Sequence, residues 1–174
     1  MVLVGWLAAA APVLAQSGGW RPDGFFLEAG QTRRETDLIG LGLRWTWNWQ
    51  SLRWGGQFSG GTELSLSRWS ARLHAGRDNQ AQLALVPLLR WTPDQGSSRW
   101  FVEAGIGLSL HQRRYETDDM RMSTRWNFVD TVALGRRLGP DDELSLRFAH
   151  VSNAGIKKPN PGEEMLMLRW ARRF

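Results

Sequence analysis

The segment Ile39-Gly40-Leu41-Gly42-Leu43-Arg44-Trp45-Thr46-Trp47 decides how the rest of the chain is interpreted. Its odd-numbered residues are large and apolar, whereas the even-numbered ones are glycine, arginine or threonine. Side chains alternate between the two faces of a β-strand, so this period of two predicts a strand with one apolar and one polar face. Residues 83–91 and 100–110 repeat the pattern over about ten residues, which is the length of a tilted strand that crosses a membrane.

The chain contains eight candidate strands, at 24–31, 38–47, 62–72, 81–91, 100–110, 124–137, 143–152 and 164–174. In the third, the apolar residues change parity between Leu66 and Trp69, a change that would fit a β-bulge. The segments 92–98 and 139–142 carry the proline, glycine and aspartate typical of turns. No helical period and no internal repeat is visible, so we predict an all-β fold.

Alternation alone also fits a soluble sandwich or a lipocalin-like barrel, and three features favour a membrane barrel instead. Tryptophans gather at strand ends, as in an interfacial aromatic girdle (Trp45, Trp47, Trp49, Trp91 and Trp100). The other parity carries Gly, Ser, Arg and Glu, which suit a narrow interior filled by polar side chains. The last strand alternates up to a terminal Phe174. We therefore predict an eight-stranded, antiparallel, up-and-down transmembrane β-barrel.

Composition excludes several other classes. The chain has 174 residues, which indicates one domain, and it has no cysteine and three separated histidines, so a zinc site or a disulfide framework has nothing to build from. We expect neither a metal nor a cofactor. The net charge of +5 suggests nucleic acid, but the basic residues occur singly or in pairs, so we expect no nucleic-acid partner. A mean hydropathy of −0.39 is too low for a bundle of membrane helices.

The first fifteen residues resemble a secretory signal peptide. Met1–Ala15 is uncharged and apolar and ends in Val13-Leu14-Ala15, so we predict cleavage before Gln16 and a single barrel domain over 16–174. The basic residue that usually precedes the apolar run is missing. A membrane anchor is the alternative, but this run is interrupted by Pro12 and is short for a span of about twenty residues.

The up-and-down order also predicts an orientation. If the N-terminus starts in the periplasm, the segments 92–98 and 138–142 are short periplasmic turns, and 111–123 and 153–163 are longer external loops. This arrangement is typical of outer-membrane barrels, so we expect the outer membrane of a Gram-negative bacterium.

The seventh strand carries the candidate chemistry. Leu144, Leu146 and Phe148 are its apolar residues and share one face, and His150 and Ser152 lie on the same face because they continue the same spacing of two. Residues two apart on a strand share a face with Cα atoms about 6.6 Å apart, close enough for an imidazole to accept a serine proton. Glu164 shares the lipid-facing parity of the eighth strand. Alternatively, the two strands leave the bilayer here and these polar groups lie among lipid headgroups.

The segment His150-Val151-Ser152-Asn153-Ala154-Gly155-Ile156-Lys157-Lys158-Pro159-Asn160-Pro161-Gly162-Glu163-Glu164 resembles the H-x-S-N-A-G…P-N-x-G-x-E signature of the lipid A 3-O-deacylase (PagL) family. The match is dense in this C-terminal part and architectural before it. The resemblance implies an eight-stranded outer-membrane barrel that hydrolyses the ester-linked acyl chain at the 3-position of lipid A. It also implies a serine-hydrolase triad on the lipid-exposed surface, near the outer leaflet.

By this resemblance Ser152 is the nucleophile, His150 the general base and Glu164 the residue that orients the imidazole. The motif alone leaves Glu163 and Glu164 open, and only Glu164 has the parity of His150 and Ser152. Asn153 and the backbone N–H of Gly155 are candidate oxyanion donors. Asn160 either braces the loop or is an ordinary turn residue between two prolines.

Basic residues on the predicted external side either contact lipid A phosphates or are solvated loop charges (Arg33, Arg34, Arg113, Arg114, Lys157 and Lys158). Two rival functions stay open: a non-enzymatic structural or adhesion barrel, and another lipid-acting barrel such as a phospholipase or an acyltransferase. The sequence leaves the oligomeric state open, with a homodimer among the options.

Overall fold

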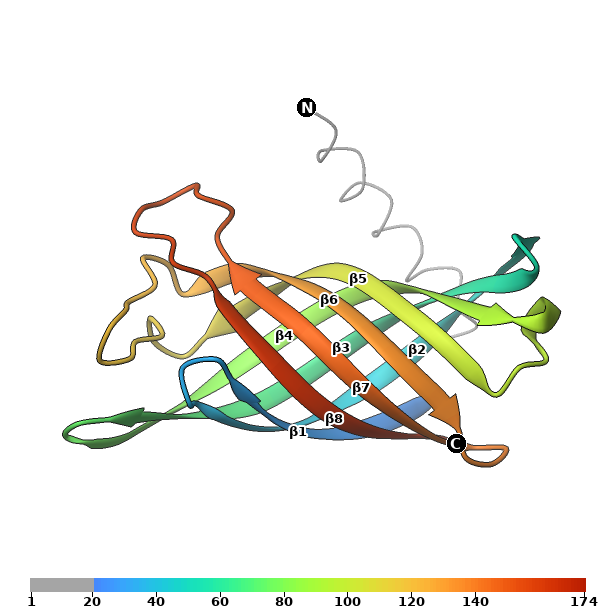
Figure 1. Ribbon diagram of the computed structural model, residues 1–174, viewed down its shortest axis with the longest axis horizontal. Coiled ribbons are helices and arrows are strands. Elements are labelled where there is room, and N and C mark those ends of the chain that lie inside the picture. Colours follow the sequence, from blue (N-terminus) through green and yellow to red (C-terminus); the bar gives the residue numbers. More distant parts are fainter. Residues whose placement is uncertain (1–20) are drawn as a thin grey trace.

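The computed structural model describes residues 21–174, which form a closed barrel of eight antiparallel strands (Figure 1). The strands are β1 (Gly24–Thr32), β2 (Asp37–Arg53), β3 (Gly56–Leu73), β4 (Gly76–Pro93), β5 (Trp100–His111), β6 (Trp126–Arg137), β7 (Asp142–Ser152) and β8 (Glu163–Arg173). Each strand pairs with the next along the chain, and β8 closes against β1. The predicted up-and-down barrel is confirmed, and the predicted signal peptide at 1–15 lies outside the described residues. Within 21–174 no helix is long and apolar enough to cross a membrane.

Three neighbouring strands are longer than the alternation predicts. β2 continues to Arg53, β3 begins at Gly56, and β4 runs from Gly76 to Pro93. β3 and β4 pair without interruption from Gly56 opposite Pro93 to Leu73 opposite Gly76. Alternation between apolar and polar residues marks a strand only where its two faces meet different surroundings. The strand ends that project past the apolar belt therefore lack the pattern.

The bulge expected in the third strand is not there. β3 keeps its register along its whole pairing with β4, and the irregularity lies in β2, between Thr46 and Gln50. The change of parity arises because Trp69 points into the barrel, where it is fully buried. Its Nε1 donates to Ser67 Oγ and to Gln82 Oε1, both at 3.1 Å. In the sequence, an interior tryptophan with polar partners therefore gives the same change of parity as a β-bulge.

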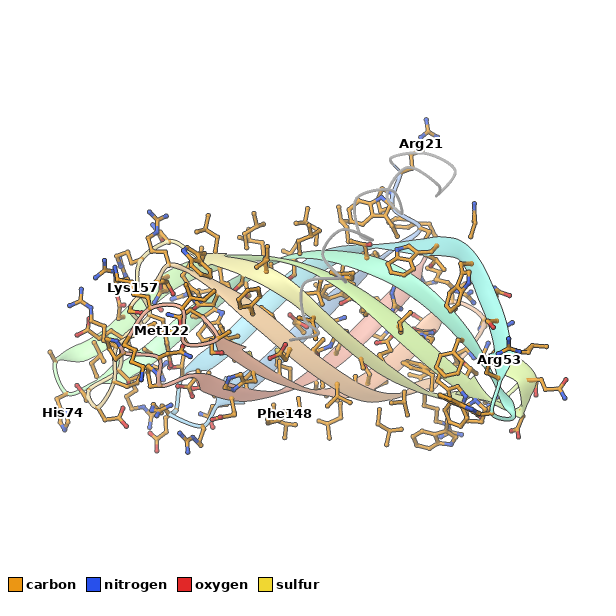
Figure 2. All side chains as sticks on the ribbon, turned by 90° about the horizontal axis from the view of Figure 1, so that it is seen from above. Arg21, Arg53, His74, Met122, Phe148 and Lys157 are labelled. Carbon is orange, nitrogen blue, oxygen red and sulfur yellow. The ribbon has the colours of Figure 1, made fainter. Side chains whose placement is uncertain are left out.

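The two faces of the barrel wall differ sharply in polarity. The outer face is a belt of exposed apolar side chains, among them Ile39 at 64%, Leu146 at 50% and Leu168 at 55% exposure. Figure 2 shows Phe148 on this wall, with His74, Met122 and Lys157 toward one end of the barrel and Arg53 at the other. An apolar belt on a closed barrel is stable in lipid hydrocarbon, because closure leaves no unpaired strand edge within it.

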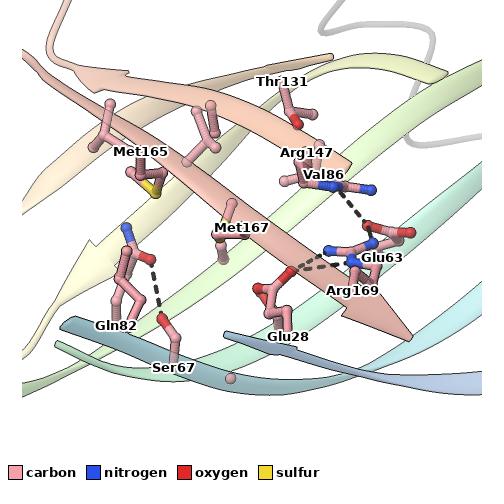
Figure 3. Close-up of a pocket in the computed structure, with 17 residues that line it drawn as sticks. Glu28, Glu63, Ser67, Gln82, Val86, Thr131, Arg147, Met165, Met167 and Arg169 are labelled. Carbon is pink, nitrogen blue, oxygen red and sulfur yellow. Dashed lines mark hydrogen bonds and ion pairs between the residues drawn. The ribbon is translucent and has the colours of Figure 1, made fainter. Parts of the chain in front are cut away.

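Inside, charged side chains fill the middle of the barrel. This interior charge cluster consists of four arginines and four glutamates (Arg44, Arg90, Arg147, Arg169, Glu28, Glu63, Glu103 and Glu143). Glu63 lies 2.6 Å from Arg169 Nη1 and 3.2 Å from Arg147 Nη1, and Glu28 lies 2.7 Å from Arg169 Nη2 (Figure 3). Four positive charges balance four negative ones, so the inward-facing polar residues of the strands form a core held together by ion pairs.

The end of the barrel that carries loops 112–125 and 153–162, here called the loop end, is closed from within. Tyr115 and Met122 of the first loop are buried, and Tyr115 packs edge-on to Trp69 at 5.0 Å between ring centroids. The Tyr115 hydroxyl lies 2.6 Å from Thr36 Oγ1. Burial raises the pKa of Tyr115 to about 12, although the bond to Thr36 acts in the opposite direction. Loops 112–125 and 153–162 are longer than the turns at the opposite end, as predicted for the external side.

Candidate active site

His150 and Ser152 lie on the outer face of β7, at the loop end of the apolar belt. They continue the outward parity of Leu146 and Phe148, which are 50% and 45% exposed. The strand ends at Ser152, and the loop that follows leaves this serine only 8% exposed. β6 places Phe128 directly opposite Ser152. The two polar side chains therefore lie between apolar strand surface and loop.

Glu164 stands directly across from His150 in the pairing of β7 with β8. Its Oε1 is 3.4 Å from His150 Nδ1, and about a third of each side chain is exposed. Glu163 points the other way: its side chain is fully buried inside the barrel, 2.8 Å from Arg34 Nη1. Of the two glutamates that the motif left open, the structure brings Glu164 to the imidazole.

Ser152 and His150 share the outer face of β7. In the described part of the chain, no hydrogen bond joins Ser152 Oγ to the imidazole, and Oγ accepts a 3.4 Å bond from the N–H of Ala154. Bonds between a nucleophile and its base are often long in a free enzyme and tighten when substrate binds. The arrangement offers a hydroxyl, an imidazole and a carboxylate in the order that nucleophilic ester cleavage needs.

The three predicted support residues brace the loop. Asn153 points into the barrel, on the other side of the wall from Ser152, and it is 1% exposed. Its amide nitrogen donates to Ser123 Oγ, Thr124 Oγ1 and the Lys157 carbonyl, and its Oδ1 accepts from the N–H of Gly155 at 3.0 Å. Asn160 Oδ1 accepts from the Asn153 N–H, also at 3.0 Å. Because strand alternation turns Asn153 inward, the structure does not bring its side chain to the reacting oxygen, and the Gly155 N–H is engaged within the loop.

Two residues at the imidazole were missed. Asp130 lies opposite His150 on β6, on the outward face that it shares with Val132 and Leu134, so a carboxylate on lipid-facing parity was a readable signal. Gly162 has a φ of +68°, and a Cβ there would lie 2.6 Å from His150 Cε1. No local pattern reveals this contact, because it depends on how loop 153–162 folds back over β7.

The predicted external cations divide into paired and unpaired groups. Arg33, Arg34 and Arg113 each form an ion pair with a carboxylate of the chain itself. Burial acts to lower the pKa of Arg34, but the hydrogen bonds and charges of Glu163 and Asp119 together outweigh it and hold this pKa above its ordinary value. Arg114, Lys157 and Lys158 are exposed. Among residues 21–174, no group of three acidic or histidine side chains is arranged to hold a metal ion.

The interior offers little room for a lipid chain. A cavity of about 40 Å³ lies between the interior charge cluster and the loop end, lined in part by Gln82, Val86, Met165 and Met167 (Figure 3). Such a volume suits a few water molecules. A lipid must therefore approach His150 and Ser152 from the outer face of the wall.

Comparison with known proteins places the chain in a family. The family model described as lipid A 3-O-deacylase (PagL) matches residues 39–173, which is most of the chain. The chain belongs to this family. With the apolar outer belt, this membership makes the chain an ester-hydrolysing enzyme of the outer membrane. The family and fold class indicated by the C-terminal motif are thus confirmed.

Individual relatives agree. The chain is 33% identical over 128 residues to the lipid A deacylase PagL of Bordetella bronchiseptica, with 70% of each chain covered. It is 28% identical over 131 residues to the lipid A deacylase PagL of Pseudomonas aeruginosa, covering 74% of this chain and 73% of that one. A crystal structure of the outer membrane enzyme PagL superposes with a TM-score of 0.76 at 24% identity, over 87% of this chain and 99% of that chain. The last comparison shows the same fold.

Proposed function

We propose that this member of the PagL family is a lipid A 3-O-deacylase, which hydrolyses the ester-linked acyl chain at the 3-position of lipid A in lipopolysaccharide. Family membership supports the reaction class, and the two relatives are named for lipid A. The observation that carries the proposal is the position of His150, Ser152 and Glu164 together on the lipid-facing side of the wall. Polar groups are costly next to hydrocarbon, so three of them gathered at the edge of the apolar belt support a functional role.

Each of the three residues has a role that its position supports. Ser152 attacks the ester carbonyl while His150 accepts the proton of its hydroxyl. The protonated imidazole then gives this proton to the departing sugar oxygen, which leaves the acyl group on Ser152. Water, deprotonated by His150, releases the fatty acid and restores the serine. Glu164, beside Nδ1, selects the imidazole tautomer that presents Nε2 to the serine and stabilises the charged ring.

The depth of the site supports a substrate within the bilayer. His150 and Ser152 follow Phe148, the last outward-facing apolar residue of β7, and precede the polar loop, at the boundary between hydrocarbon and headgroups. The ester bonds of a lipid lie at this boundary. A lipid A molecule already in the outer leaflet can therefore approach laterally, with its acyl chains along the belt beside Phe148 and Phe128.

Mass spectrometry of lipid A tests this proposal. Cells expressing the unchanged protein, Ser152→Ala or the control Ser97→Ala are compared, after heat-modified gel mobility has shown that all three barrels fold. Ser97 lies in the turn at the far end of the barrel and bonds only to the local Asp94 carbonyl among the described contacts. We expect loss of one 3-linked hydroxyacyl chain with the unchanged protein and Ser97→Ala, and intact lipid A with Ser152→Ala. Deacylated phospholipid with intact lipid A would identify a phospholipase. No change in either lipid would identify a non-enzymatic barrel.

A further inference from the structure

The turn between β1 and β2 lies against the beginning of β8. The pairing of β1 with β8 ends at Thr32 opposite Met165, and the turn extends it by one bond, from the Arg33 N–H to the Glu164 carbonyl at 2.9 Å. The Arg34 N–H then donates to Glu163 Oε1 at 3.2 Å. Two consecutive arginines of the turn thus meet two consecutive glutamates of β8.

The two arginines contact β8 on opposite faces of the wall. Arg34 points inward, where its Nη1 donates to buried Glu163 at 2.8 Å and to the Gly162 carbonyl at 3.2 Å. Its Nε lies 3.3 Å from Asp119 in loop 112–125. Arg34 therefore fixes the turn to the backbone on which Glu164 stands. It also fixes Gly162, which lies against the His150 ring.

Arg33 points outward and contacts Glu164. Its Nε is 3.1 Å from Glu164 Oε2, while the other carboxylate oxygen, Oε1, is 3.4 Å from His150 Nδ1. The carboxylate is thus shared between a guanidinium and an imidazole. Arg33 contacts Oε2 through its charge and without a hydrogen bond, and this attraction favours the carboxylate orientation in which Oε1 faces the ring.

We propose that Arg33 is a positioning residue of the active site, which acts by holding the Glu164 carboxylate in register with His150. The inference rests on the proposed function, because it assigns Arg33 to the group that orients the general base. The Arg33 side chain is 64% exposed, and ion pairs that are so open to solvent add little to folding stability. Its contribution is to the geometry of the reacting groups, where small displacements have large effects on rate.

A direct contact between Arg33 and a phosphate of the substrate predicts different kinetics. If Arg33 binds a substrate phosphate equally well in the ground state and the transition state, replacing Arg33 raises KM. This increase does not depend on which residue stands at position 164. Replacing a residue that acts through Glu164 lowers kcat, and the same replacement has no further effect once Glu164 has itself been replaced.

The experiment measures deacylation of lipid A in detergent micelles by the purified full chain. The variants are Arg33→Gln, Arg33→Lys, Glu164→Gln and the double variant Arg33→Gln/Glu164→Gln, with Ser152→Ala as the inactive reference. Arg72→Gln is the matched control: Arg72 of β3 is 57% exposed and pairs at 3.0 Å with Glu35 of the turn between β1 and β2, and neither contacts His150 or Glu164 among the described interactions.

We expect Arg33→Gln to lower kcat about tenfold with KM changed by less than about twofold, Arg33→Lys to recover most of the rate, and Arg72→Gln to match the unchanged protein. Glu164→Gln and the double variant should have equal rates. A normal kcat in Arg33→Gln, a change in KM alone, or an equal further loss in the Glu164→Gln background would overturn the role of Arg33, while the losses in Ser152→Ala and Glu164→Gln would leave the proposed function standing. Full activity of Ser152→Ala would overturn both.

Discussion

The interior charge cluster and the outward group of His150, Ser152 and Glu164 lie on opposite faces of the barrel wall, and they use polar side chains in opposite ways. Inside, Glu63, Glu103 and Glu143 each contact two or more guanidinium groups, and their side chains are at most 8% exposed. Outside, the imidazole meets a single glutamate at 3.4 Å, and both side chains are about one-third exposed. Buried charges that are paired several times belong to the fold, whereas partly exposed groups with one partner stay available to a substrate.

Separate replacement of the two neighbouring glutamates of β8, Glu163 and Glu164, tests this contrast most strongly. We expect Glu164→Gln to lower the deacylation rate on the order of 10²- to 10⁴-fold, since a neutral amide neither selects the reactive imidazole tautomer nor stabilises its charged form. Glu163→Gln should keep most of the activity of the unchanged protein, because Glu163 lies inside the barrel and supports the site only through Arg34. Initial rates on lipid A micelles measure both, with Glu35→Gln on the exposed turn as the control. Equal losses at 163 and 164 would contradict the assignment.

Removing a carboxylate from the interior should act on stability instead. Glu103 contacts Arg44, Arg90 and Arg147, so Glu103→Ala removes one carboxylate partner from each of three buried cations and should lower the free energy of unfolding by about 3–5 kcal/mol. Urea titration followed by tryptophan fluorescence measures this change. Glu116→Ala, which removes the exposed pair with Arg121, should change stability by less than about 1 kcal/mol. The activity per folded molecule of Glu103→Ala should be normal, and a selective loss would link the cluster to catalysis.

A charge introduced on the outer face sharpens the contrast. Leu146 lies in the middle of the belt, between Leu134 and Leu168 on the neighbouring strands. Leu146→Arg should lower the free energy of unfolding in lipid by about 2–4 kcal/mol, because the guanidinium faces hydrocarbon without a partner. Leu138→Arg, in the turn at the far end, is the control and should cost little. Equal stabilities of the two variants would show that the belt is not in contact with hydrocarbon at Leu146.

The smallest effect should be a pH dependence from the buried phenol at the loop end. The pKa of Tyr115 is about 12 in the folded barrel and about 10 in an unfolded chain, so the unfolded state loses its proton first. The contribution of Tyr115 to stability should therefore be constant below pH 10 and fall as the pH rises from 10 to 12, by on the order of 2 kcal/mol. Unfolding titrations at pH 9 and 11.5 measure the difference. Tyr115→Phe should reduce it, and an undiminished slope in this variant would assign the effect to other groups.

Local pattern was sufficient for the barrel and for the polar face of β7. A side chain's face follows from parity, so Ile39–Trp47 predicted the belt, and His150, Ser152 and Glu164 could be assigned to one side of the wall. The same parity places Glu163 inside. Parity was misleading at Trp69, where a large apolar residue faces inward because Ser67 and Gln82 satisfy its indole N–H.

What the sequence by itself determined is the alternation, the order of the strands and the motif at the end of β7, because these depend on neighbours along the chain. What only the tertiary structure decided are contacts between distant segments. Closure of β8 against β1 brings Arg33 to Glu164, and the fold of the long loops places Gly162 against His150 and turns Asn153 toward Ser123 and Thr124. No periodic pattern in the sequence relates the two members of such a pair, because they lie far apart along the chain. Their contact can be recognised only in the closed barrel.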